Sequence, residues 1–398
     1  MVQMIEIAER ARVRVRPERT QAEPLAFLRR LDWVLFAAGL ALVGYGLWVV
    51  AGITKFDVPG DENYFVVRQG IAAVLGLAAL VFAAAVPVHL ALRHWRLLYG
   101  ATLGLMILVF LAAETIRGSK RWIDLGFIQF QPSELGKVLF VLAIAAFLVE
   151  RAGRVMRWRT IASAIALGGF PILLVFLQPD LGTALVYSGA LFALLFFVGV
   201  RWRHLLVLFV AGMLAVLAVL WFLPAAGVQV LKPYQADRFT GFLDRNRDPG
   251  GLTWNVNQSI TAVGSGGFDG RGPAAATQTR LDYLPEHATD FAFASLAEQR
   301  GFVGCTILLL LYLLVVWRGL RVVTVAGDLF GAVVAGGLVF AFLFQVFVNV
   351  GMTMGVAPVT GIPLPFVTVG GTSLVSNLFL IGVLQGIHAR GNLGRPSP

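Results

Sequence analysis

The sequence predicts an all-α integral membrane protein, and three observations support this class. Of its 398 residues, 58% are hydrophobic and only 14% are charged, whereas a soluble domain carries roughly 25% charged residues. The mean hydropathy is +0.79. The apolar residues are gathered into long runs, and about 20 such residues can cross a bilayer as a helix. We therefore expect ten transmembrane helices, with one large external loop between the seventh and the eighth.

The apolar runs set the expected boundaries of these helices. The ten spans are expected at residues 32–53, 66–87, 95–113, 133–149, 161–177, 182–199, 205–223, 291–317, 329–350 and 373–388. The chain then divides into a basic tail at 1–31, a membrane domain at 32–388 that contains the external loop 224–290, and a second tail at 389–398. Within the loop, a short amphipathic or re-entrant piece is expected around Trp254 to Val263.

The distribution of Lys and Arg predicts the orientation. With the N-terminus inside, the cytoplasmic segments hold more of these residues than the external ones, so both termini are expected in the cytoplasm. The polar, Gly-rich and Pro-rich segments then all face outward, which makes the external side the working face. The basic N-terminal tail favours an anionic lipid surface over nucleic acid. The single cysteine, Cys305, excludes an internal disulfide.

Charged residues are concentrated in one stretch, Leu281 to Arg300. Its Asp290 lies 11 residues before Gly301, or about 16 Å along a continuous helix, which places it near headgroup height. A carboxylate there could act as a general base on a lipid-linked substrate. Alternatively, Thr289 or Asp290 could cap a helix that begins at Phe291. Both interpretations are compatible with the spacing.

Two further sites place charge at the ends of spans. Glu134 and Lys137 are three residues apart, so they share a helix face. They should face a polar cavity or each other, and a local ion pair at the helix end would also explain them. Asp180 lies in a tight turn between two spans, where it could pair with a cation from another helix or serve the turn itself.

External cations suggest an anionic ligand. Lys120 and Arg121 run against the topology rule, so we expect them to have an anionic partner, for which a phosphate group is the natural choice. Arg68 also lies at an external span mouth, where it could bind such a group or snorkel to the interface. The segment 351–372 contains three prolines between spans. It cannot form a regular helix, and non-helical backbone at this depth must be buried in protein or line a cavity. We expect an externally open groove there.

Several motifs resemble those of one known family. In chain order they are SKRWIDLG, FQPSELGK, QPDLGTA, NQSITAVGSGGFDGRG, TQTRLDYLPEHATDF and GIPLPFVTVGGTS. Together they are similar to the SEDS family, the bacterial shape, elongation, division and sporulation proteins, from about Arg68 to Asn377. TQTRLDYLPE after GRG, with the DPGG and NQS loop, is more like the RodA branch. Departures occur at Ala288, Gln299 and Val369.

The resemblance implies a ten-span peptidoglycan glycosyltransferase at the outer face of the cytoplasmic membrane, serving cell elongation and shape. It would join lipid II units into β-1,4-linked strands by an inverting mechanism. The family's essential acidic residue falls on Asp290, the general base. Glu134, Lys137, Asp180 and Arg68 match supporting positions. The remaining expected binding or supporting residues are Lys120, Arg121, Arg238, Gln258, Ser265, Gln278, Glu286, Thr372 and Ser373. We interpret Asp282, His287 and Glu298 as bystanders.

The resemblance also implies ligands and partners. A divalent cation, Mg²⁺ or Mn²⁺, would offset the diphosphate charge, with Asp290 a candidate ligand, and no organic cofactor is expected. Partners would be lipid II, the growing glycan strand, a class B penicillin-binding protein, elongation-complex proteins and membrane lipids. The alternatives are a lipid II flippase or transporter, a division polymerase of the FtsW type, and a non-catalytic scaffold. Ionisable groups near the midplane of several helices would favour a transporter.

Overall fold

The computed structural model describes residues 27–112, 121–124, 126, 129–227, 242 and 252–391. In these ranges nine helices are long and apolar enough to cross a membrane, and Leu181–Phe197, with 17 residues, is a shorter apolar helix. The predicted all-α membrane class is therefore confirmed. The count of ten crossings and the external position of the large loop stay predictions.

The bundle consists of the longer helices and a few short connecting elements. Its helices are α3 (Trp33–Ile53), α4 (Tyr64–Ala85), α5 (His89–Arg93), α6 (Trp95–Ala112), α7 (Pro132–Val149), α8 (Trp158–Leu177), α9 (Leu181–Phe197), α10 (Trp202–Leu217), α15 (Ala292–Val325), α16 (Leu329–Thr353) and α17 (Gly371–Gly391). The shorter elements are the 3₁₀ turn η1 (Ala152–Arg154), the π-helical turn η2 (Ala218–Phe222), α11 (Leu223–Ala225), α13 (Leu252–Ser265) and α14 (Thr277–Arg280). Strands β1 (Ile123–Asp124) and β2 (Gln129–Phe130) form one short antiparallel pair.

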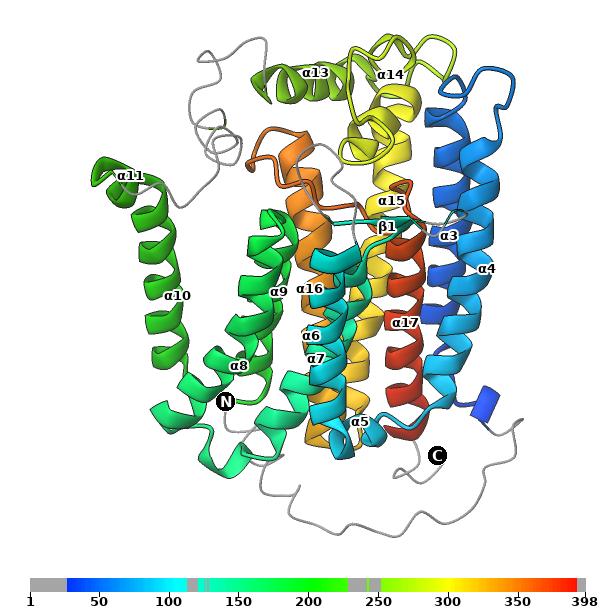
Figure 1. Ribbon diagram of the computed structural model, residues 1–398. Coiled ribbons are helices and arrows are strands. Elements are labelled where there is room, and N and C mark those ends of the chain that lie inside the picture. The colour runs from blue at the N-terminus through cyan, green and yellow to red at the C-terminus, as the bar shows by residue number, and fades with distance from the viewer. Residues whose placement is uncertain are drawn as a thin grey trace.

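Three helices form the centre of the bundle. Within their most apolar windows, 83% of the residues of α7 and of α17 and 72% of those of α16 are buried, against 6% for α10 with η2 and α11. Helix α17 packs along α4, and α16 packs against α9 and α15. Figure 1 shows α10 at the left, standing apart from the other helices. Polar side chains on the central helices are thus enclosed by protein, while those on α10 face the surroundings.

A buried ion pair joins the start of α3 to α15, and its aspartate also contacts the last helix, α17. Asp32, the N-cap of α3, accepts hydrogen bonds from the Arg318 guanidinium at 2.9 and 3.1 Å. Its backbone also exchanges two hydrogen bonds with Gln385 of α17, each 2.8 Å. Helix α15 continues past 317, the expected end of the eighth span, as far as Val325, and Asp32 pairs with Arg318 in this extension; the end of the membrane span itself stays a prediction.

Helix α15 is broken at Gly301, which has φ 62° and ψ −160°. A glycine-rich segment, residues 266–272, fills the break. The N–H groups of Phe302 and Val303 donate to the carbonyls of Gly267 and Phe268, at 2.9 and 3.2 Å. In return, the N–H groups of Arg271 and Gly272 donate to the carbonyls of Glu298 and Gln299, both at 2.9 Å. The break therefore leaves these four backbone groups hydrogen-bonded, as buried groups must be.

Two predicted features of the loops are confirmed. The amphipathic piece expected at 254–263 is the helix α13, which lies across the top of the bundle in Figure 1. The Pro-rich segment is non-helical from 355 to 370, and its residues 359–368 are almost all buried. This buried, irregular backbone connects α16 to α17. We call residues 355–370 the Pro-rich floor, because they contact the turn that carries Asp290.

Candidate active site

Asp290 lies at the end of a turn that precedes α15. Helix α15 begins at Ala292, and its N-cap is Phe291, which makes no side-chain capping hydrogen bond. The expectation that Thr289 or Asp290 caps this helix is therefore wrong. So is the expectation of one helix from Asp290 to Gly301, because the helix begins only at Ala292 and breaks at Gly301.

The turn keeps its shape through local hydrogen bonds. The Phe291 N–H donates to the Glu286 carbonyl at 3.1 Å, and the Thr289 hydroxyl donates to the Glu286 carboxylate at 2.7 Å. Glu286 therefore supports the turn through both its backbone and its side chain. This is the geometry of a supporting residue next to Asp290.

Three hydrogen bonds fasten the backbone of this turn to α16 and to the Pro-rich segment. The Asn349 amide of α16 donates to the Asp290 carbonyl at 3.1 Å. The Thr368 hydroxyl donates to the Thr289 carbonyl at 2.9 Å, and the Val369 N–H donates to the Ala288 carbonyl at 2.9 Å. Three consecutive residues are thus anchored to α16 and to the Pro-rich segment, which fixes where the Asp290 side chain starts.

Glu134 and Lys137 lie on α7 and are almost fully buried. Their side chains are 3.2 Å apart, and the Lys137 ammonium also donates to Gln345 of α16 at 2.6 Å. Gln345 in turn donates to the Pro363 carbonyl at 2.8 Å. The two side chains face each other as an ion pair, which is one of the alternatives that the sequence left open, and Gln345 extends this pair into a buried polar cluster.

Gln345 and Asn349 are functional candidates that sequence reasoning missed. They are four residues apart, so they share one face of α16. Asn349 donates a second bond, of 2.7 Å, to the Ile362 carbonyl. The face therefore links Lys137, the Pro-rich floor and the backbone of Asp290. The available signal in the sequence was two amides one turn apart in an apolar run.

Asp180 performs both of the roles that the sequence left open. It is the N-cap of α9 and accepts from the Thr183 N–H at 3.1 Å. It also lies 3.7 Å from the Arg121 guanidinium and accepts from the Gln131 amide at 3.3 Å. The anionic partner expected for Arg121 is thus Asp180 within the protein. Arg121 also bonds to the Pro179 carbonyl.

Residues near the N-terminal ends of α17 and α4 both contact the segment around β1 and β2. The Thr372 hydroxyl donates to the Gln129 carbonyl at 2.7 Å and accepts from the Gln131 N–H at 3.1 Å. Arg68 donates to the Gly126 carbonyl at 3.0 Å and stacks over the Tyr64 ring. Ser373 accepts from Asn377 within α17. These contacts place Thr372 beside Gln131, which contacts Asp180.

Three other predicted residues lie on α13 and α14, and two more fall outside the described residues. The backbone N–H of Gln278 donates to Glu298 at 2.8 Å, and the Ser265 hydroxyl donates to the Ala262 carbonyl at 3.0 Å. Gln258 is half-buried on α13. None of these contacts reaches Asp290. Lys120 and Arg238 lie outside the described residues.

Two residues interpreted as bystanders have defined structural contacts. Glu298 is fully buried and accepts three hydrogen bonds, one from Gln278 and two from Thr279, so it holds the start of α14. His287 lies 3.1 Å from Asp57 and 3.6 Å from Asp282. Burial alone would lower the pKa of His287, but the hydrogen bond and charge of Asp57, with the charge of Asp282, raise that pKa above its usual 6.5.

The donor set does not form a resident metal centre. Across the described ranges, no three His, Cys, Asp or Glu side chains gather closely enough to hold an ion. The cations near the floor are also largely engaged by protein, Lys137 by Glu134 and Arg121 by Asp180. The described residues therefore offer a carboxylate on an anchored backbone, together with buried charge pairs elsewhere in the bundle, and this suits proton transfer more than metal storage.

A bundle of apolar helices around a polar cluster at one end defines a multi-span membrane protein with an enclosed polar site. The family model described as "Cell cycle protein" (FtsW, RodA and SpoVE) matches residues 31–392, so the chain belongs to this family. The resemblance to the SEDS family and its RodA-like branch is thereby confirmed.

Individual relatives cover most of the chain. The peptidoglycan glycosyltransferase MrdB of Escherichia coli K12 is 36% identical over 88% of this chain and 92% of its own length. The stage V sporulation protein E of Bacillus subtilis is 35% identical over 92% and 97%. A probable peptidoglycan glycosyltransferase FtsW of Thioalkalivibrio sulfidiphilus is 38% identical over 90% of both chains.

Solved structures share the fold. A chain from a peptidoglycan synthase complex, described as coordinating polymerization and crosslinking, has a TM-score of 0.76 and 33% identity, and the match covers 91% of this chain and 98% of that one. RodA of Thermus thermophilus has a TM-score of 0.64 and 28% identity, with 90% and 96% covered. The chain-long agreement in both sequence and fold is what links the site to the chemistry of these relatives.

Proposed function

We propose that this protein is a peptidoglycan glycosyltransferase of the RodA type, which joins lipid II units into β-1,4-linked glycan strands during cell elongation. The observation that carries the proposal is the anchored turn of Asp290. Three consecutive backbone carbonyls are bonded to α16 and to the Pro-rich segment, in a chain whose relatives are named peptidoglycan glycosyltransferases.

The chemistry needs one base and a stabilised leaving group. In the proposed reaction, the Asp290 carboxylate removes the proton from the 4-hydroxyl of the acceptor sugar as that oxygen attacks the anomeric carbon of the donor. The bond from that carbon to the lipid diphosphate breaks, and the diphosphate leaves with the electron pair. Attack opposite the leaving group inverts the anomeric centre. Rigid anchoring of the turn favours this step, because proximity and orientation lower the barrier only when the geometry is held.

Fixed positive charge supports departure of the diphosphate. The candidates are Arg68, Arg121 and Lys137, with Lys120 and Arg238 from outside the described residues. Glu134 holds Lys137 in place through their 3.2 Å contact. A divalent cation, Mg²⁺ or Mn²⁺, would arrive with the substrate diphosphate, since the part of the chain that is described contains no cluster of three protein ligands.

The expected setting follows from the same proposal. The protein would lie in the bacterial cytoplasmic membrane with both termini inside and Asp290 at the outer face. Its partner would be a class B penicillin-binding protein that crosslinks the new strands, within the elongation complex. The pairing of polymerization and crosslinking in a structurally similar complex supports this partner. A flippase is not favoured, because the relatives that cover most of the chain are named peptidoglycan glycosyltransferases.

Polymerisation of purified lipid II by the purified protein tests the proposal. Asp290→Asn should reduce strand synthesis to background while the unfolding temperature stays close to that of the wild type. Asp282→Asn is the matched control, because it removes a carboxylate that is exposed in the same stretch. Full polymerase activity in Asp290→Asn would contradict the assignment of the base, and a folded wild type that moves lipid II across vesicles without polymerising it would contradict the function.

A further inference from the structure

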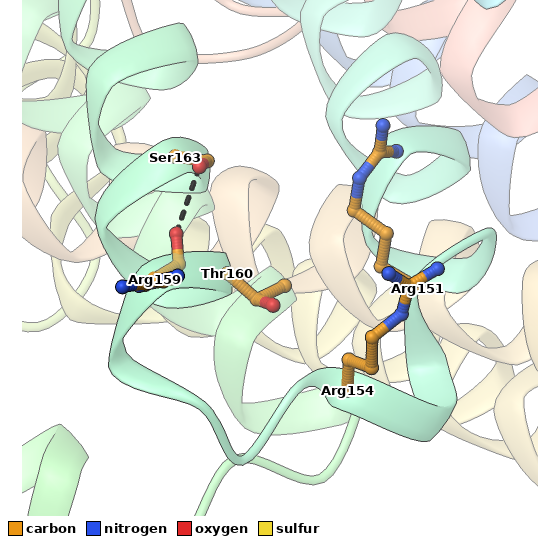
Figure 2. A pocket seen from close by; sticks show the side chains of 5 residues that line it. All are labelled: Arg151, Arg154, Arg159, Thr160 and Ser163. Carbon is orange, nitrogen blue, oxygen red and sulfur yellow. Dashed lines mark hydrogen bonds between the residues drawn. The ribbon is translucent and has the colours of Figure 1, made fainter.

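A second polar site lies at the opposite end of the bundle from Asp290. A cavity of about 130 Å³ lies where α7 ends and α8 begins, and Arg151, Arg154, Arg159, Thr160 and Ser163 line it. Figure 2 shows Arg151 and Arg154 on one side, with Thr160 and Ser163 on the other. A single water needs roughly 15 Å³ of such volume, so the cavity is large enough for a group of several atoms.

The lining carries positive charge and no carboxylate. Arg151 is held in place by three contacts: its guanidinium donates to the Phe147 carbonyl at 3.2 Å, lies 4.0 Å from the centre of the Phe147 ring, and reaches Glu150 at 3.3 Å. Glu150 also accepts a bond from the Trp95 indole at 2.9 Å. Glu150 therefore compensates for one of the three guanidinium groups at most.

Two of the arginines are available to a ligand. Arg154 and Arg159 are exposed, and within the described residues their guanidinium groups form no hydrogen bond or salt bridge. The side chains therefore supply donors and charge that the protein itself does not use.

The buried side of the cavity also favours an anionic ligand. Thr160 is only 9% exposed, it lines the cavity, and its hydroxyl has no hydrogen-bond partner in the described part of the chain. It lies in the first turn of α8, whose N-cap, Arg157, makes no side-chain capping bond. The start of this 20-residue helix is thus uncapped, and helix N-termini attract anions through their free N–H groups and dipole.

We propose that this cavity binds the phosphate group of an anionic membrane lipid. Arg154 and Arg159 would pair with the phosphate oxygens, and the Thr160 hydroxyl would donate to one of them. The exposed side chains of Met156 and Trp158 lie at the same turn, and Trp is typical of the membrane interface. In the orientation proposed above, the lipid belongs to the cytoplasmic leaflet. The inference concerns lipid binding and does not depend on the catalytic proposal.

Native mass spectrometry of the purified full-length protein can test this site. Phosphatidylglycerol, or phosphatidylcholine as the neutral comparison, is titrated into detergent-solubilised wild type and variants. Each basic side chain near an anionic lipid contributes about fivefold to affinity, so Arg154→Gln with Arg159→Gln should weaken phosphatidylglycerol binding roughly 25-fold. Thr160→Val keeps the shape, removes the hydroxyl, and should weaken it about tenfold. Binding of phosphatidylcholine should not change.

The control variant is Arg93→Gln, because Arg93 is an exposed arginine of another connecting helix, α5. It should bind phosphatidylglycerol within about twofold of the wild type. Equal losses in Arg93→Gln and in the double variant would overturn the site, as would unchanged binding in the double variant. A competition arm adds inorganic phosphate. If phosphate displaces the lipid at equal concentration, the site is one for soluble anions and the lipid assignment is wrong.

Discussion

The side-chain amide of Asn349 donates a hydrogen bond of 3.1 Å to the backbone carbonyl of Asp290. The same amide donates to the Ile362 carbonyl at 2.7 Å, so one buried side chain joins the turn of the candidate base to the Pro-rich floor. Asn349 does not need to touch substrate to matter, because it determines the position of the turn that carries the carboxylate.

Asn349→Ala should lower kcat for lipid II polymerisation about 100-fold with little change in KM, since a shift of about 1 Å in a catalytic group can cost this much. Gln385→Ala is the matched control. Gln385 is an equally buried amide with two hydrogen bonds, at the Asp32 end of the bundle. Both variants should lose similar stability in thermal unfolding, but only Asn349→Ala should lose turnover per folded molecule. Equal loss of turnover in both would show that Asn349 is merely structural.

Lys137 and Glu134 should behave as a coupled pair. Lys137→Met leaves a buried carboxylate without its cation, which should destabilise the protein by about 3–5 kcal/mol. Adding Glu134→Gln should restore much of that loss, because the uncompensated charge disappears. Chemical denaturation of the two single variants and the double variant measures the coupling. Stability that returns without polymerase activity assigns the pair to the site, and additive losses would contradict the coupling.

Gly301→Ala should destabilise the protein by about 3 kcal/mol or more. The backbone there has φ 62° and ψ −160°, a region almost restricted to glycine. A Cβ would also lie 2.4 Å from the Gly270 nitrogen and 2.5 Å from the Phe268 oxygen. Gly44→Ala is the control, since a Cβ there has open space and a helical backbone. A thermal shift that is equally small in both variants would mean that the break in α15 is not fixed by glycine.

His287 should make stability depend on pH in one direction. Its pKa in the folded protein is raised above the usual 6.5 by Asp57 and Asp282, although burial opposes this shift. The folded state therefore binds the proton more tightly than the unfolded state. The resulting stabilisation is complete below about pH 6.5 and is lost as the pH rises through the raised pKa. Unfolding temperatures between pH 6 and 9 should fall more steeply for the wild type than for Asp57→Asn. Parallel curves would exclude this ion pair as the cause.

Removal of divalent cations should slow polymerisation, and the protein without substrate should hold no tightly bound ion. Protein desalted with a chelator should contain no stoichiometric metal by elemental analysis, because the described residues offer no cluster of three ligands. Activity should return with Mg²⁺ or Mn²⁺ in a manner that depends on the lipid II concentration. Tight binding of one ion to the substrate-free protein would contradict this expectation.

The sequence predicted the spans well because long apolar runs have one stable form in a bilayer. It did not show that the eighth helix continues past residue 317, because Arg318 gave no indication that Asp32, which is 286 positions away, neutralises it. The motif residues Glu134, Lys137 and Asp180 were found because charges are rare in spans. Gln345 and Asn349 were missed because a neutral amide carries no charge to single it out, and because their partners are carbonyls of a segment whose path only tertiary structure reveals.

The hydrogen bonds between residues 266–272 and the break in α15 also limit how this loop can change. Glycine-rich external loops are usually the places where insertions, tags and fused domains are tolerated. Here one extra residue would shift the register of four backbone hydrogen bonds and leave groups of α15 unpaired beside Gly301. The length of this loop is therefore as constrained as that of a helix in the core, so a fluorescent or affinity label is better placed elsewhere.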